Sequence, residues 1–374
     1  MTERKSALVL SGGGARGAYQ VGVIKALASL TKPGTQPFPI LTGVSVGALN
    51  ACVLAADGDD FPRAAAELEK IWRALSCDAV YRTDWRAMSG NILGWLRAAV
   101  FGWAGARPPR SLLDNAPLRD LLDTHIDFAR LNSTVGEGAL KAFAITSSSY
   151  ATGRAITFFK SERDIEQWQR ARREGVRSNF SPDHVLGSSA LPFVFPAIEH
   201  GGIYYGDGAL RENAPLSAAI HLGCDRIFTI GARDLEPDPE KPQAHPVYPS
   251  VGYLAGQMLD ILFNDNADAD IERLKRINST LALLTDEQRQ NSHLRPIEIF
   301  AINPSTDIRE IAGRHSHELP ASVKAILRVI GAMSEPWVLP SYLTFEPGYI
   351  GELIDLGYAD TMAQKAQWQA MLGI

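Results

Sequence analysis

The feature that most constrains the fold is a serine held between two glycines, where an apolar run gives way to a helix-forming run. Residues 40–53 read ILTGVSVGALNACV, with the pattern Gly43-x-Ser45-x-Gly47 at the change. This order predicts a strand, a sharp turn and a helix. The two glycines let the backbone crowd the turn without a Cβ clash, and Ser45 then lies at a helix N-terminus. Such a position suits a nucleophile, although small residues at a turn also match this short pattern by chance.

A glycine-rich turn comes earlier in the chain. Residues 6–10 predict a short buried strand, which leads through SGGGARG at 11–17 into a run with helical spacing. Gly12, Gly14 and Gly17 match the G-x-G-x-x-G pattern of dinucleotide sites. Such a site also requires an acidic residue after its second strand, and no Asp or Glu occurs over residues 4–56. We therefore expect no nicotinamide or flavin cofactor, and the loop N–H groups can instead form an anion-binding oxyanion hole.

Composition and charge narrow the class of protein. With 374 residues, 45% apolar and 21% charged, the chain is an ordinary globular protein of one large or two medium domains. A formal net charge of −5 predicts no nucleic-acid partner. The three cysteines are odd in number and far apart, so we expect neither disulfides nor a metal site. No signal peptide and no run of ~18 apolar residues is found, which predicts a cytoplasmic protein, with peripheral contact with a membrane left open.

Strand and helix patterns alternate along the rest of the chain. Residues 140–149 predict a strand with a hairpin partner at 154–159, residues 203–208 a strand that ends in a turn at Asp207, and residues 295–302 the last strand. The charged stretch 161–177 predicts a solvated face. The sequence therefore predicts an α/β catalytic domain over residues 1–310. The helical extension expected over 311–374 would pack on this core, where it covers a sheet edge or mediates self-association as a homodimer.

Residues 81–110 differ from their surroundings because aromatic residues alternate with arginines. Trp95, Phe101 and Trp103 lie in a nearly continuous apolar run with arginines at its edges. This composition suits a membrane interface and predicts a lipid-facing cap, and a buried helical hairpin with arginines at its rim is the alternative. Pro192 and Phe193, in an aromatic and proline-rich segment, are further expected lipid contacts.

A serine nucleophile needs a base, usually a histidine. None of the eight histidines stands in a convincing turn. His221 lies in an apolar helix and is expected to be structural, whereas His315 and His317 lie in a polar segment and are expected to be exposed. Asp207 forms a turn between glycines. The glycine loop, Ser45 and Asp207 all follow predicted strands, and the carboxyl ends of strands are where sites assemble in α/β sheets. A base other than histidine must therefore be considered.

Four segments in this order and spacing resemble the patatin-like phospholipases. They are SGGGARG at 11–17, GVSVG at 43–47, SALPFVFP at 189–196 and DGA at 207–209. The likeness to bacterial members extends over SLLDNAPLRDLL at 111–122, NAP at 213–215 and SYLTFEPGYIGELIDLGYAD at 341–360, nearly the whole chain. The resemblance implies a three-layer α/β/α fold with a mainly parallel central sheet. It also implies hydrolysis of acyl esters of phospholipids or lysophospholipids without a metal or other cofactor.

The resemblance also assigns roles to individual residues. Ser45 is the nucleophile and Asp207 the base that accepts its proton directly. The oxyanion hole is formed by the backbone N–H groups of Gly12, Gly13 and Gly14. The supporting positions are Arg16, which adds charge or a salt bridge, and Gly17, Gly43, Gly47 and Gly208. Ser11 stands where many members have Asp, and Ala209 where many have Gly.

Three other functions compete with this interpretation. An acyltransferase would share the acyl-enzyme, and a catalytically silent lipid-binding protein would keep the fold. An α/β-hydrolase also uses G-x-S-x-G, but there several strands precede the nucleophile, whereas here only one strand precedes the strand that leads to Ser45.

Overall fold

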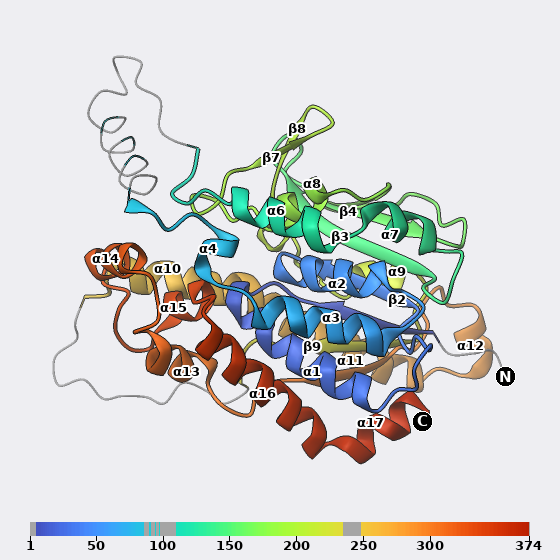
Figure 1. Cartoon of the computed structure of the whole chain (residues 1–374). Helices are drawn as coiled ribbons and strands as arrows, with labels where there is room; N and C mark the ends of the chain where they lie inside the picture. Colours follow the sequence, from blue (N-terminus) through green and yellow to red (C-terminus); the bar gives the residue numbers. More distant parts are fainter. Residues whose placement is uncertain are drawn as a thin grey trace.

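The protein has a mixed α/β fold, seen in a computed structural model that describes residues 5–85, 110–234 and 248–373 together with Gly90, Gly94 and Arg97 (Figure 1). A ten-stranded sheet has the order β10-β9-β1-β2-β3-β4-β6-β5, and β7 and β8 join it through β3. Five neighbouring strands are parallel: β10 (Glu298–Ile302), β9 (Arg226–Ile230), β1 (Ser6–Leu10), β2 (Ile40–Val44) and β3 (Ala142–Ser149). The predicted fold class, with a mainly parallel central sheet, is confirmed.

The remaining strands widen and extend the sheet beyond β3. The hairpin partner predicted for β3 is present as β4 (Ala155–Ser161), which is antiparallel to it. The charged stretch 161–177 is not only a solvated face, because it carries β5 (Gln169–Arg170) and β6 (Arg173–Arg177), and Gly175 is buried against the Trp168 ring. An edge strand with one solvated face has the same alternation of polar residues as a surface loop, so the pattern did not distinguish them. A second hairpin, β7 (Ile198–His200) and β8 (Ile203–Asp207), lies antiparallel beside the end of β3.

Helices cover both faces of the sheet, which gives three layers (Figure 1). Alternation along β1 sends Leu8 and Leu10 into one buried cluster and Ala7 and Val9 into another, as expected for a parallel strand covered on both sides. The first cluster lies under α1 (Gly17–Ser29), α2 (Val46–Ala56), α3 (Phe61–Arg73) and α16 (Pro347–Ala363). The second lies under α9 (Ser217–His221) and α11 (Asn266–Ala282).

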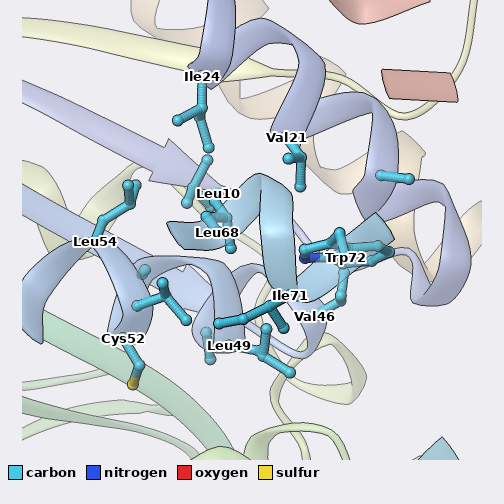
Figure 2. Packing of buried hydrophobic residues seen from close by; sticks show 14 of the residues in the cluster. Leu10, Val21, Ile24, Val46, Leu49, Cys52, Leu54, Leu68, Ile71 and Trp72 are labelled. Atoms are coloured by element: carbon cyan, nitrogen blue, oxygen red, sulfur yellow. The ribbon is translucent and has the colours of Figure 1, made fainter. Parts of the chain in front are cut away.

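The helix α3 illustrates how the sequence specifies this packing. It begins at Asp60, whose carboxylate accepts a hydrogen bond from the Arg63 N–H at 3.1 Å, a common N-cap arrangement. Leu68, Ile71 and Trp72 recur at helical spacing and are buried. In Figure 2, Ile71 lies against Leu49 of α2, and Trp72 lies beside Val46. The α2 helix that starts at Ser45 is thus held from outside by α3.

The other helices complete the layers and the carboxyl edge of the sheet. They are α4 (Cys77–Val80), α6 (Ala116–His125), α7 (Phe128–Thr134), α8 (Pro182–Ser188), α10 (Val251–Asp260), α12 (Asp286–Gln290), α13 (Ile308–His315), α14 (Ala321–Val329), α15 (Val338–Leu343) and α17 (Lys365–Leu372). A π-helical segment, η4 (Ile261–Asp265), joins α10 to α11 in one continuous helical run. Within the described residues, no helix is both long and apolar enough to cross a membrane.

The C-terminal helices pack on the core through α1. A Cβ at Gly22 of α1 would lie 2.0 Å from the Ile354 carbonyl oxygen, and a Cβ at Gly357 of α16 would lie 2.3 Å from the Tyr19 carbonyl oxygen. These glycines let the two helix backbones approach closely. The Tyr19 hydroxyl also donates to Asp360 Oδ2 at 3.0 Å. In this arrangement α16 covers α1, and α17 reaches the sheet, where Trp368 lies 5.9 Å from the Phe228 ring of β9.

Candidate active site

Ser45 occupies a strained turn between β2 and α2. Its φ of 54° and ψ of −127° are unusual for a residue with a side chain. The Ser45 N–H donates to Ser188 Oγ at 2.9 Å, and that hydroxyl donates to the Thr146 carbonyl at 2.6 Å. A Cβ at Gly43 would lie 2.3 Å from the Gly47 carbonyl oxygen, and one at Gly47 would lie 2.1 Å from the Leu10 carbonyl oxygen. Only glycine therefore fits at either position, and the turn is fixed from several sides.

Asp207 reaches Ser45 because β8 takes the place beside β3 that β2 leaves vacant. Along one side of β3, Val44 of β2 pairs with Thr146, and Asp207 of β8 pairs with Ser147, the next residue. The other side of β3 is occupied by β4. Since β2 and β8 run in opposite directions, their carboxyl ends meet. Gly208 fits into this junction, since a Cβ there would lie 2.2 Å from the Thr146 carbonyl oxygen and 2.4 Å from Val44 Cγ2.

The Asp207 carboxylate is buried and only partly satisfied. Its exposed fraction is 1%, and Oδ1 accepts a hydrogen bond from the Ala209 N–H at 3.0 Å. Oδ2 is buried and has no hydrogen-bond partner among the described residues. Burial raises the pKa of Asp207 to about 7, and hydrogen bonding from the Ser45 side chain and the Ala209 N–H acts in the opposite direction. The serine is therefore close enough to affect the carboxylate, although no full hydrogen bond joins them, a common state of such pairs before substrate binds.

The glycine loop lies against Ser45 from the side of β1. A Cβ at Gly12 would lie 3.1 Å from the Ser45 Cβ and 2.4 Å from the Phe263 ring. Gly14 has a φ of 54°, and a Cβ there would lie 2.4 Å from the Tyr342 carbonyl oxygen. Gly12 and Gly13 are buried, yet no acceptor for their N–H groups is found within residues 5–85, 110–234 and 248–373. Buried unpaired N–H groups are rare, so a loop that keeps two of them is prepared to bind an anionic atom.

Arg16 fixes the glycine loop to the C-terminal half of the chain. Its side chain is buried and forms a 3.0 Å ion pair with Asp260 at the end of α10. The guanidinium also donates to Ser341 Oγ of α15, at 3.0 Å from Nε and 2.8 Å from Nη2. Tyr342 lies under the guanidinium at 3.9 Å and donates its own hydroxyl to Asp260 at 2.8 Å. Of the two roles expected for Arg16, the geometry favours the salt bridge that holds the loop.

A chain of buried amides connects the first three helices to the same loop. The Trp72 indole N–H donates to Asn50 at 2.8 Å, Asn50 donates to Gln20 at 3.0 Å, and Gln20 donates to the Ser11 carbonyl at 2.9 Å. Gly17 belongs to this network because its carbonyl accepts from Asn50 Nδ2 at 3.4 Å, and a Cβ at this glycine would lie 2.8 Å from the Val46 side chain. The loop and the start of α2 are therefore held in one network.

A small apolar cluster adjoins the loop and the Asp207 turn. Its buried members are Ala209, Phe263, Val338 and Tyr342, with Leu191, Leu259, Leu262 and Leu343 packed against them. The cluster joins the turn after β8 to the π segment η4 and to α15. It supplies an apolar wall beside Ser45, because the Phe263 ring touches Gly12.

A second carboxylate, Glu212, lies near Asp207. Burial raises its pKa to about 8, the Thr146 side chain lowers it, and the negative charges of Asp207 and Asp270 raise it further. The sequence did not point to Glu212, because it follows the Asp207 turn without any pattern of its own.

His221 and His315 are held by contacts outside this arrangement. His221 contacts the Ser217 carbonyl at 2.8 Å and stacks on Trp168 at 4.6 Å. The expectation of exposure was wrong for His315, whose side chain is 18% exposed and bridges Glu318 and Glu352 at 2.8 and 2.7 Å. His315 ends helix α13, and packing of α16 against α13 places Glu352 beside it. A local sequence pattern does not predict such a tertiary contact.

The residues expected to contact lipid are only partly described. Trp95, Phe101 and Trp103, with most of the predicted cap over 81–110, lie outside the described residues. Phe193 is 70% exposed with a φ of 66°, and its carbonyl accepts from the Leu112 N–H at 2.8 Å. Pro192 is half-buried. Lipid contact by these residues stays a prediction.

Several residues of the site carried no recognisable signal in the sequence. Ser188, Asp260, Phe263, Ser341 and Tyr342 come from segments that a tertiary contact alone brings to the loop. Ser188 precedes the quoted segment 189–196, and Ser341 and Tyr342 begin the quoted segment 341–360, but neither segment indicated a contact with the glycine loop. In the part of the chain that the structure describes, no group of three His, Cys, Asp or Glu side chains is arranged to hold a metal ion.

The chain is similar to several known proteins. The family model "Patatin-like phospholipase" matches residues 8–220. A cGAMP-activated phospholipase from Pseudomonas aeruginosa is 27% identical over 215 residues, which are 57% of this chain and 55% of that protein. The lysophospholipase nte1 of Aspergillus niger is 38% identical over 248 residues, which are 65% of this chain and 12% of that protein. This chain thus spans about half of the first relative and a small part of the second. The solved structure of VipD from Legionella pneumophila covers 98% of this chain and 67% of its own, at 15% identity and a TM-score of 0.37.

Proposed function

The chain belongs to the patatin-like phospholipase family, and from that membership we propose that it is a serine hydrolase of lipid acyl esters, of the phospholipase A or lysophospholipase type. The observation that supports this most directly is the meeting of β2 and β8. It brings a strained serine to a buried carboxylate that has one unpartnered oxygen and a pKa raised to about 7. The phospholipase and lysophospholipase names of the relatives support a lipid substrate.

The proposed mechanism follows from these groups. Ser45 Oγ attacks the ester carbonyl carbon while its proton passes to Asp207 Oδ2, which has the pKa of a useful base near neutral pH. The carbonyl oxygen becomes an anion that accepts hydrogen bonds from the Gly12 and Gly13 N–H groups. Loss of one such donor typically costs ~10²- to 10³-fold in rate. The tetrahedral adduct then collapses, Asp207 returns the proton to the leaving alcohol, and an acyl-enzyme remains.

Hydrolysis of the acyl-enzyme repeats these steps with water. Asp207 takes a proton from a water molecule, which attacks the acyl carbon, and the Ser45–acyl bond breaks as Ser45 regains a proton. A lipid alcohol in place of water would give acyl transfer by the same intermediate. A hydrolysis assay with a panel of lipids, read for the acyl chain and the head group that are released, separates these outcomes and identifies the substrate.

Labelling by a fluorophosphonate tests the nucleophile. We expect labelling of the wild type at Ser45, and we expect Ser45→Ala to lose labelling and ester turnover because the attacking oxygen is gone. Ser279→Ala, which removes an exposed serine of α11, is the matched control and should leave both unchanged. Full turnover by Ser45→Ala would exclude this mechanism.

A further inference from the structure

An exposed apolar stripe runs along the outer face of α10 and into η4. Its members, which we name the α10 stripe, are Val251, Leu254, Met258 and Ile261, with exposed fractions of 70%, 45%, 69% and 57%. Their spacing keeps them on one side of the helix. Tyr248 before the helix is 89% exposed, and Val329 at the end of the neighbouring α14 is 87% exposed. Further exposed apolar side chains thus lie on the segments next to α10.

The opposite face of α10 is fully used in packing. A Cβ at Gly252 would lie 2.6 Å from the Ala332 Cβ, and one at Gly256 would lie 2.8 Å from the Val338 Cβ. The Gly252 N–H also donates to the Ile330 carbonyl at 2.7 Å, which holds α10 beside α14 (Figure 1). A surface helix normally presents polar residues on the face away from its core. Here both faces are apolar, which marks the outer one as an interaction surface.

The stripe also lacks charge. Residues 248–263 read YPSVGYLAGQMLDILF, in which Asp260 is the single charged residue. Asp260 is buried and paired with Arg16. A surface that selects a protein partner usually carries a polar rim that fixes orientation. The α10 stripe offers aliphatic side chains and a thioether, which insert among acyl chains without needing a defined partner.

The same helical run leads directly to the candidate active site. Phe263 follows Ile261 by two residues on η4, but it points inward and touches Gly12 beside Ser45. Asp260 and Phe263 thus connect the inner side of the run to the glycine loop, while Met258 and Ile261 remain outside. The stripe and the glycine loop thus lie on opposite sides of the same helical run.

We propose that the α10 stripe is the surface by which this protein docks onto a lipid layer without net charge, so that the layer lies against the helical run that also contacts the glycine loop. This inference rests on the proposed function for its choice of a lipid as the occupant. Docking depends on burial of apolar side chains and not on charge. It therefore differs from the arginine-flanked cap predicted for residues 81–110.

Vesicle binding tests the stripe separately from catalysis. The probe is vesicles of phosphatidylcholine, and the proteins carry Ser45→Ala so that no lipid is consumed. Leu254→Ser combined with Met258→Ser should weaken partitioning at least about tenfold, because both variants replace an apolar side chain that the lipid layer would bury with a polar one. The matched control is Leu283→Ser with Leu294→Ser, two exposed leucines near α12, at the other end of the molecule in Figure 1. This pair should change binding less than twofold.

Salt and stability complete the test. Raising the salt from about 0.05 to 0.5 M should change binding little, since screening affects charges and not apolar burial. In the background with Ser45 intact, both pairs should keep the thermal midpoint and the turnover of a short, water-soluble ester. The proposal is overturned if the protein does not bind neutral vesicles, if both pairs bind equally, or if binding requires anionic lipid at low salt.

Sedimentation separates lipid docking from self-association. A wild type that sediments as a dimer, with the stripe pair as a monomer, would show that a second copy covers this face and would overturn the proposal. The proposed function fails differently. In that case the wild type hydrolyses no ester, while the binding of the Ser45→Ala proteins remains measurable.

Discussion

At the scale of single residues, the ionisation of Asp207 is governed by two opposing effects. A base must be ionised to accept a proton, but burial of this side chain favours its neutral form and raises the pKa to about 7. The Ala209 N–H and the Ser45 side chain recover part of the lost solvation. In the proposed mechanism, the remaining shift gives the carboxylate the basicity that a histidine would otherwise provide. No histidine among the described residues occupies that position.

The pH dependence of turnover follows from this pKa. Turnover of a water-soluble ester should rise with pH and level off above about 7, as Asp207 loses its proton. The measurement is kcat/KM from about pH 5 to 9 for the wild type. A profile that is flat down to the acid end of this range would mean that the carboxylate is not the titrating base.

The same shift predicts how stability changes with pH. The folded-state pKa of Asp207 lies above the ordinary value near 4, so the folded protein holds a proton that the unfolded chain releases between about pH 4 and 7. The free energy of unfolding should therefore fall as pH rises through this window. Asp207→Asn should remove this decrease in the free energy of unfolding, which amounts to on the order of a few kcal/mol by about pH 8. The same variant should abolish ester turnover. Urea titrations of both proteins at about pH 4 and 8 measure the difference. This difference also contains the lowering of the Glu212 pKa that follows when the Asp207 charge is removed.

At the scale of elements, α10 acts on the active site through Arg16. Asp260 neutralises the buried guanidinium, and Ser341 and Tyr342 of α15 complete its surroundings. Gly14 is held by the backbone of Tyr342, so α15 contacts the loop at both ends of η1 (Gly14–Arg16). The N–H groups proposed for the oxyanion are therefore oriented by helices that come from the last third of the chain.

Removal of one charge tests this support. Asp260→Asn keeps the side-chain shape but leaves Arg16 buried without its counter-charge, which typically costs about 3 to 5 kcal/mol of stability. In the protein that remains folded we expect kcat to fall at least about tenfold with little change in KM, since a misplaced oxyanion donor weakens the transition state more than the bound substrate. Asp265→Asn, on the exposed side of the same helical run, is the control. An equal effect of both variants would argue against a role specific to Arg16.

How far the sequence predicts these elements depends on how local their causes are. The strands β1 and β2 and the helices after them follow from periodicity and from glycines that permit close backbone contact at 43 and 47. The direction of β8 has no local cause. Its antiparallel pairing with β3 depends on which edge remains free after β2 ends, and this places Asp207 beside Ser45. The contributions of Asp260 and Tyr342 also depend on tertiary packing and were missed.

At the scale of the whole molecule, the end of the chain packs against its first helix, α1. The first helix after the glycine loop is covered by α16, near the end of the chain, with glycine at both points of closest approach. Together with the contacts of α15, this makes residues beyond 310 part of the structure that holds the loop. The division at residue 310 stays a prediction about domains, but the two parts share one hydrophobic core.

Truncation tests whether the C-terminal helices are needed for folding. A chain that ends at residue 310 should lose cooperative thermal unfolding and aggregate, because α1 would expose apolar residues that α16 covers, among them Val23 and Tyr19. A chain that ends at residue 364, which removes only α17, should unfold cooperatively at a lower temperature. Circular dichroism melts and size-exclusion chromatography distinguish the two. A monomeric, cooperatively folded chain of residues 1–310 would contradict the expectation.

The hairpin of β7 and β8 has a consequence for insertions and deletions. Three pairs fix the register of β8 on β3, and side chains alternate between faces along a strand, so one residue gained or lost within residues 203–206 would turn the Asp207 carboxylate away from Ser45. The turn at Gly201 and Gly202 is different, since a Cβ at either glycine would meet nothing within 4 Å. Chain length is thus free to vary at the tip of this hairpin and is fixed along the strand that follows it.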